Sequence, residues 1–199
     1  MKIIIIFTVF LCLLQYRIFP FSSADTSVTI PQFRNMAWGT SQENVRKKES
    51  AYYLQTFMGF GLVTLSFKDK LAGLDTRVDY TFKNDNFTEG SYIIKSGDSF
   101  KDDFINLLDY LTHQYGRPEF RSGPHLISDS IWVKRDNYKS FSGPAFYWKY
   151  KDGFIALISN KFEEDITITI LYAYNATIEN YLEINGVELN KFNFKVIEK

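Results

Sequence analysis

Apolar and polar residues alternate with a period of two in several segments of the chain. The clearest are 77–82, 146–150 and 166–172, where aromatic or β-branched residues occupy every second position. This spacing is typical of a strand with one buried face and one face in water. The segment 62–67 and another segment that starts at Tyr92 are also rich in strand-forming residues. The sequence therefore predicts a sheet as the main element of the fold.

Short polar or glycine-containing segments separate these strands and predict turns. They are 68–73, 84–86, 151–153 and 163–165. Neighbouring strands joined by short turns pair in antiparallel fashion. The end of the chain, 175–199, leaves two alternatives open, which are a hairpin at Asn185-Gly186 and a short helix that begins near Thr177.

Two segments carry helix signals. Thr40 and Glu43 fit a capping box that would start a helix reaching about Ala51, with 46–49 exposed. The second helix is expected over 99–115, with a capping box formed by Ser99 and Asp102. Gly116 and Pro118 end it. Its apolar face comprises Phe100, Phe104, Leu107, Leu108, Leu111 and Tyr115.

These elements predict an α+β domain with an antiparallel sheet and two main helices. The expected order is helix, three strands, helix, then three or four strands. The halves 33–95 and 99–173 follow the same order, which suggests two similar halves. We expect residues 25–199 to form a single α+β domain.

Residues 1–24 have the layout of a secretory signal peptide: a basic start, an apolar run from Ile3 to Leu14, and small residues at Ser22-Ser23-Ala24. We expect an exported protein, periplasmic or extracellular, without an integral membrane span once the signal is cleaved. The alternative is a membrane anchor formed by the uncleaved segment. Cys12, the only cysteine, lies in this run. The mature chain would then lack disulfides and thiol chemistry.

The charge balance argues against some partners. Without Lys2 and Arg17 the 23 basic residues become 21, against 23 acidic ones, so the mature net charge is about −2. This balance gives no basic surface for nucleic acid.

The two histidines, His113 and His125, lack metal-ligand spacing, and His113 is expected to be solvated. No nucleotide-binding or serine-hydrolase motif is present, so no cofactor and no catalytic residue are predicted.

The segment 117–143 contains the candidate partner-binding residues. It is long, irregular and rich in basic and aromatic side chains, and such loops are often functional. Arginine, tryptophan and tyrosine are also the residue types that anchor protein interfaces. The alternative is that these aromatic residues only pack the loop onto the core. The candidates are Arg121, His125, Trp132, Arg135 and Tyr138.

Phe33–Val45, followed by Glu49, resembles a pattern in exported bacterial proteins of unknown function, which have a Trp-Gly-Thr/Ser helix start. The strand Val78–Phe82 and Tyr115-Gly116-Arg117-Pro118 extend the likeness. The helix start is also distantly similar to small envelope domains of the BamE type and of the β-lactamase-inhibitor-protein type. The resemblance implies an α+β fold that binds other proteins. It carries over no functional residue.

We therefore expect a non-enzymatic binding or envelope-associated protein whose partner is a protein or an envelope component. The alternative is a carboxylate-dependent hydrolase acting on cell-wall or polysaccharide material. A cleft with two carboxylates about 5–10 Å apart would favour the hydrolase. An exposed apolar patch of several hundred Å² would favour binding. A purely structural exported domain is the third alternative.

Overall fold

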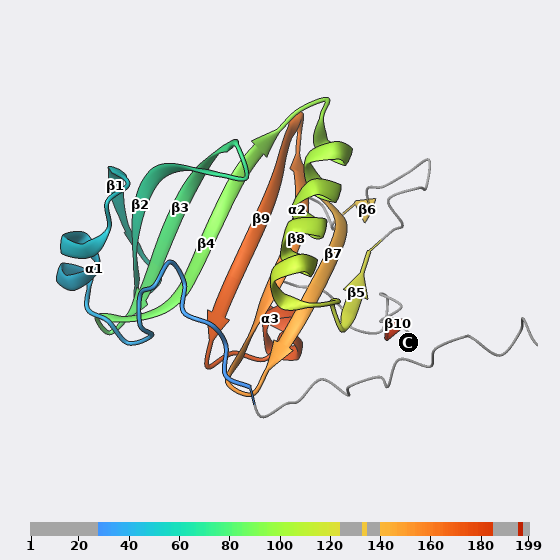
Figure 1. The fold of residues 1–199 in the computed structure, drawn as a ribbon. Helices are drawn as coiled ribbons and strands as arrows, with labels where there is room; N and C mark the ends of the chain where they lie inside the picture. Colours follow the sequence, from blue (N-terminus) through green and yellow to red (C-terminus); the bar gives the residue numbers. More distant parts are fainter. Residues whose placement is uncertain (1–27, 124–132, 135–139, 185–194, 197–199) are drawn as a thin grey trace, which may run out of the picture.

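The computed structural model describes residues 28–123, 133–134, 140–184 and 195–196 (Figure 1). Its helices are α1 (Gln42–Lys48), α2 (Phe100–Tyr115) and α3 (Ile178–Ile184). Its strands are β1 (Tyr52–Gly59), β2 (Leu62–Leu71), β3 (Leu74–Lys83), β4 (Asn86–Ser96), β5 (Phe120–Ser122), β6 (Val133–Lys134), β7 (Ser140–Tyr150), β8 (Gly153–Phe162), β9 (Asp165–Tyr174) and β10 (Lys195–Val196). None of the helices in these ranges combines the length and hydropathy that crossing a membrane requires.

The described strands form one sheet in the order β1-β2-β3-β4-β9-β8-β7-β5-β10, and β6 pairs with β7 beside this path. Every pairing is antiparallel. Two meanders, β1 to β4 and β7 to β9, meet where β4 pairs with β9 (Figure 1). The fold is thus mostly antiparallel sheet with few helices, as the alternating segments predict.

The strand β1 was not expected from the sequence, and it adds a fourth strand before α2. Residues 52–59 lack the period of two because apolar side chains occupy both faces of this edge strand. Pairing with β2 holds the strand in place. The expected turn at 68–73 is also shorter, since β2 continues to Leu71 before Ala72-Gly73 turns the chain.

The predicted capping box of the first helix is wrong. α1 begins at Gln42 and ends at Lys48, short of Ala51. The Thr40 hydroxyl donates to a backbone carbonyl three residues earlier. The free backbone N–H of Gln42 instead donates to Oδ1 of Asp85, in the turn between β3 and β4, at 3.1 Å. The side chain of Asp85, which is distant in sequence, therefore accepts a hydrogen bond from the first turn of the helix. The local sequence pattern predicted that Thr40 and Glu43 would do so.

The second helix is confirmed, and α2 lies across one face of the sheet (Figure 1). Phe100, Phe104, Leu107 and Leu111 are buried against it. Leu108 and Tyr115 pack at the margin. Burying each of these side chains contributes roughly 1.5–3 kcal/mol, so this face is a major part of the core.

The predicted pairing of Ser99 with Asp102 at the start of α2 is wrong. Ser99 makes no side-chain hydrogen bond to the helix backbone. Its hydroxyl donates to Oδ2 of Asp103 at 2.8 Å, and the Ser96 hydroxyl donates to the same oxygen at 2.7 Å. Asp103, in the first turn, therefore links the end of β4 to the helix.

The segment before α1 runs over the same face of the sheet as α2. Phe33 is buried on it and contacts the rings of Tyr80, Tyr92 and Tyr172. Gly90 of β4 lies beneath this ring, and a Cβ there would come within 2.3 Å of it. The missing side chain at Gly90 thus lets Phe33 approach the strand and fixes the path of the segment.

The opposite face of the sheet has a smaller apolar cluster under α3. Ile178 of α3 packs there with residues of β7, β8 and β9. Of the two alternatives for the end of the chain, the short helix near Thr177 is the one present. Asn185-Gly186 lies outside the described residues.

Candidate functional site

Of the candidate partner-binding residues, only Arg121 lies within the described part of the chain. It is half-buried in β5, opposite Phe146 of β7 and Lys195 of β10. His125, Trp132, Arg135 and Tyr138 lie outside the described residues. The binding role of this loop therefore stays a prediction.

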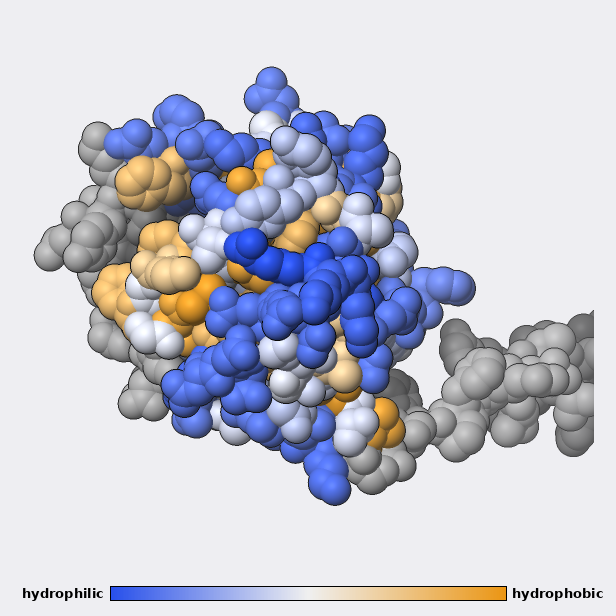
Figure 2. Space-filling model, turned by 90° about the vertical axis from the view of Figure 1, so that its left-hand side faces the viewer, coloured by the Kyte–Doolittle hydropathy of each residue, from blue (hydrophilic) through white to orange (hydrophobic). Residues whose placement is uncertain are grey.

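The most exposed apolar surface in the described residues lies at the opposite end of the sheet. Among the described strands, β1 is outermost and pairs only with β2. The side chain of Tyr52 is 74% exposed, Phe57 57%, Met58 73% and Phe60 100%. Tyr53, Leu54 and Leu62 add to this surface, which we call the β1 edge. Figure 2 looks onto this end of the molecule and shows apolar side chains gathered beside a polar region.

The β1 edge lacks the charged residues and prolines that usually protect such a strand, although a register shift interrupts its pairing with β2 between Tyr53 and Gln55. The run 52–62 contains neither a charged residue nor a proline. Natural edge strands are normally blunted by lysine, proline or a covering element, because their free backbone groups can pair with another chain. This surface is absent from the sequence-based predictions, although the uncharged run 52–62 marks it.

The helix α1 borders the β1 edge and is basic in its last turn, with Arg46, Lys47 and Lys48. The guanidinium of Arg46 donates to the hydroxyls of Tyr53, at 3.1 Å, and Thr56, at 2.6 Å. It also lies over the Tyr53 ring, 4.7 Å from the centroid. One face of the edge strand is thus flanked by positive charge.

A cluster around Arg34 fixes α1 and the preceding segment to the sheet. Arg34 donates to both Glu49 carboxylate oxygens, at 2.9 and 3.0 Å, and to Oδ2 of Asp69, at 2.6 Å. The Tyr80 hydroxyl also donates to Glu49. The Glu49 side chain is only 3% exposed, so its expected position on the exposed part of the helix is wrong.

The protonation of the cluster follows from these contacts. Burial alone would raise the pKa of the Glu49 carboxyl, but donation from Arg34 and Tyr80 outweighs it and lowers the pKa. Burial and the Glu49 charge raise the pKa of the Tyr80 hydroxyl, which keeps its proton. The cluster is therefore an ion pair in which the arginine charge is compensated by two carboxylates.

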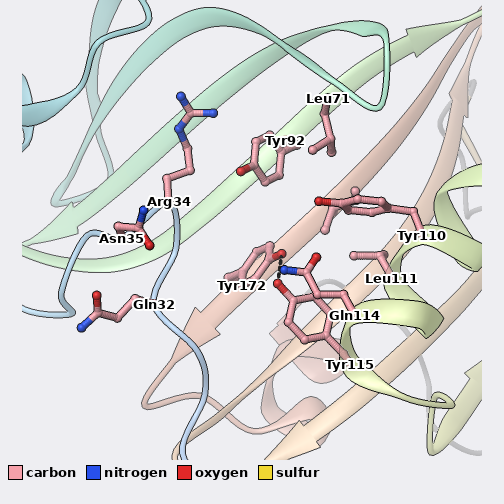
Figure 3. A pocket seen from close by; sticks show the side chains of 11 residues that line it. Gln32, Arg34, Asn35, Leu71, Tyr92, Tyr110, Leu111, Gln114, Tyr115 and Tyr172 are labelled. Carbon is pink, nitrogen blue, oxygen red and sulfur yellow. Dashed lines mark hydrogen bonds between the residues drawn. The ribbon is translucent and has the colours of Figure 1, made fainter.

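A pocket of about 170 Å³ lies between the segment before α1 and the helix α2 (Figure 3). Tyr92 of β4 and Tyr172 of β9 line it from the sheet, and Tyr110 and Tyr115 line it from α2. The hydroxyls of Tyr115 and Tyr172 are hydrogen bonded at 2.9 Å. The remaining lining residues are Gln32, Arg34, Asn35, Leu71, Leu111, Gln114 and Ile170.

Two carboxyl groups lie close together on the other face of the sheet. Asp79 of β3 is opposite Ser91, and Glu89 of β4 is opposite Thr81, so the two are diagonal neighbours. Burial and the charge of Asp79 raise the pKa of the Glu89 carboxyl from its ordinary 4.5 to about 7. Arg77 donates to Oδ2 of Asp79 at 3.1 Å, while the buried Oδ1 has no hydrogen-bond partner among the described residues.

Among the residues that the structure describes, no group of three or more histidine, cysteine, aspartate or glutamate side chains could hold a metal ion. His113 is exposed on α2, as predicted. His125 and Cys12 lie outside the described residues. The arrangement of the described residues thus offers an apolar strand edge, a polar pocket and a carboxyl pair.

Comparison with known proteins does not assign these features to a known family. The resemblance to exported bacterial proteins with a Trp-Gly-Thr/Ser helix start stays a prediction. The chain matches no known protein family, no curated protein and no solved structure.

Proposed function

We propose that this chain is a non-enzymatic protein-binding domain of an exported protein and that it captures an extended segment of a partner on the β1 edge. The observation that carries this proposal is an uncharged outer strand with apolar side chains exposed on both faces. The resemblance to envelope domains that bind other proteins supports the same function.

Strand addition would use both the free backbone groups and the exposed apolar side chains of the β1 edge. A peptide that lies antiparallel to β1 would pair with its outward backbone groups, which have no strand beside them in the described structure. The four most exposed aromatic and methionine side chains present on the order of 500 Å² of surface, comparable with the largest apolar patch of a typical monomer, which is often functional. The partner would cover these side chains and gain affinity from both contributions.

Charge favours a different protein over a second copy of this chain. Two copies paired edge to edge would place two basic α1 helices on the same face of the joined sheet. An apolar strand flanked by acidic residues would instead meet Arg46 and Lys48 with opposite charge. Such complementarity steers association and sets register more than it raises affinity. The partner segment is therefore apolar with acidic flanks.

A double variant tests this surface. Phe57→Lys with Met58→Lys places charge on both faces of β1, at exposed positions where folding tolerates it. We expect at least tenfold weaker binding of a probe peptide of alternating valine and threonine flanked by glutamates. Fluorescence anisotropy of the labelled peptide measures this loss. Hydrogen exchange on the wild-type chain should show new amide protection confined to β1.

The matched control carries Ile105→Lys with Phe162→Lys, which changes exposed apolar residues away from this edge. It should bind the peptide as the wild type does. A second probe peptide has lysines in place of the flanking glutamates. If the wild-type chain binds it as tightly as the glutamate-flanked peptide, the charge argument is contradicted. Sedimentation showing a dimer that Phe57→Lys with Met58→Lys dissociates would assign the edge to a second copy and overturn the proposal.

The carboxylate-dependent hydrolase is the second candidate, and the Asp79–Glu89 pair is the observation that favours it. Diagonal neighbours on adjacent strands lie about 7–8 Å apart, so their side chains can place two carboxyl groups within the range of roughly 5–10 Å that glycoside hydrolysis uses. With a pKa of about 7, Glu89 suits a general acid, and Asp79 would act as the base.

Glu89→Gln removes the acid in this candidate while keeping the side-chain size. If the chain is a hydrolase, release of reducing ends from solubilised cell-wall glycan should fall at least 100-fold in this variant. The Glu43→Gln variant, on exposed α1, should retain full activity. A wild-type chain without activity on this material contradicts the hydrolase and leaves the binding proposal standing.

A further inference from the structure

We propose that the pocket between α2 and the segment before α1 binds a neutral, polyhydroxylated ligand of the size of one monosaccharide unit. This site lies apart from the β1 edge and does not depend on the function proposed for that edge.

The surface of the pocket is mainly polar. Leu111 and Ile170 are fully buried beneath it, so tyrosines and amides supply most of the accessible surface, with half-buried Leu71 at the margin. Its volume of about 170 Å³ equals roughly six water molecules. A pyranose ring suits such a surface, because the hydroxyls around the ring can pair with the tyrosine and amide groups.

Hydrogen-bonding groups gather around this space from three parts of the chain. Figure 3 shows the Tyr92 and Tyr172 side chains on the sheet facing Tyr110, Gln114 and Tyr115 of α2. On the third side, the segment before α1 contributes the side-chain amides of Gln32 and Asn35. Each tyrosine hydroxyl and each amide both donates and accepts, as a sugar hydroxyl does. Burial raises the pKa of the Tyr92 and Tyr172 hydroxyls, so both remain donors at neutral pH.

The charge of the lining points to a neutral ligand. Among the described residues that line the pocket, Arg34 is the one charged side chain. Its guanidinium is already held by Glu49 and Asp69 at hydrogen-bond distance. An anion would have to compete with two carboxylates for this group, and a cation would find no carboxylate of its own in the lining. Both classes are therefore disfavoured.

Titration of the full chain with glucose and N-acetylglucosamine tests the proposal, with glucuronate as the charged counterpart. Calorimetry and saturation-transfer NMR report binding. At least one neutral sugar should bind saturably and more tightly than glucuronate. The double variant Tyr110→Phe with Gln114→Leu, at exposed positions of α2, should weaken that binding at least tenfold.

The control variant carries the same two changes on the β1 edge, Tyr52→Phe with Gln55→Leu, and should bind the sugar as the wild type does. Absence of saturable binding for both neutral sugars would overturn the proposal. So would equal weakening by the control variant. Glucuronate binding as tightly as glucose would overturn the choice of a neutral ligand.

Discussion

The Arg34→Leu variant is expected to lose about 3–5 kcal/mol of its free energy of unfolding, measured by urea denaturation. The change leaves Glu49 buried, with its side chain only 3% exposed, and without its bidentate partner. An uncompensated carboxylate in that position must either remain charged at high energy or take up a proton. The apparent pKa of Glu49 should rise accordingly, and the loss of stability should be smaller at acid pH.

An exposed ion pair provides the comparison for this prediction. Lys47 of α1 pairs with Glu43 at 2.6 Å, but both side chains are largely in solvent, at 68% and 77% exposure. Lys47→Ala should therefore change the free energy of unfolding by less than about 1 kcal/mol. If Arg34→Leu were as mild as Lys47→Ala, the cluster would not be what fixes the segment before α1 to the sheet.

The Glu89→Gln variant is expected to be more stable than the wild type above pH 7, by about 3 kcal/mol. The folded chain holds the Glu89 proton up to a pKa of about 7, whereas the unfolded chain releases it near 4.5. Between these values the folded state binds more protons, so the free energy of unfolding falls as pH rises. Glutamine stays neutral and removes this decline.

Thermal unfolding of both chains from pH 4 to pH 9 measures the effect. The melting temperatures of wild type and Glu89→Gln should nearly coincide at pH 4 and separate between pH 4.5 and 7. Glu43→Gln changes an exposed carboxyl and should follow the wild type throughout. Parallel curves for wild type and Glu89→Gln would show that the Glu89 carboxyl titrates normally.

The strands and the helix α2 could be predicted because their signals are local. A period of two marks 77–82 and 166–172, and the apolar face of 99–115 marks a helix. The strand β1 escaped prediction for the same reason. Its side chains are exposed on both faces, so no alternation marks it, and it exists because β2 offers a pairing edge.

The Arg34 cluster and the pocket could not be predicted because they join residues that are distant in sequence. Arg34, Glu49 and Asp69 are residue types that usually lie in water, and only the folded chain brings them together. The motif Phe33–Val45 with Glu49 includes two members of the cluster but gives no sign that they pair. Phe33 proves to be core, and Arg34 and Glu49 form the ion pair.

The pairing of β4 with β9 has a consequence for how the chain acquires its fold. Ser96 of β4 lies opposite Ile166 of β9, and Glu89 lies opposite Ala173. The partner strand β9 is therefore made only after α2, β7 and β8 have left the ribosome. At about 5–20 residues per second, the edge of β4 waits for several seconds. Closing this seam is a long-range step, which slows folding. During synthesis the first meander therefore has two open edges, β4 and β1, and completion of the chain covers only the first.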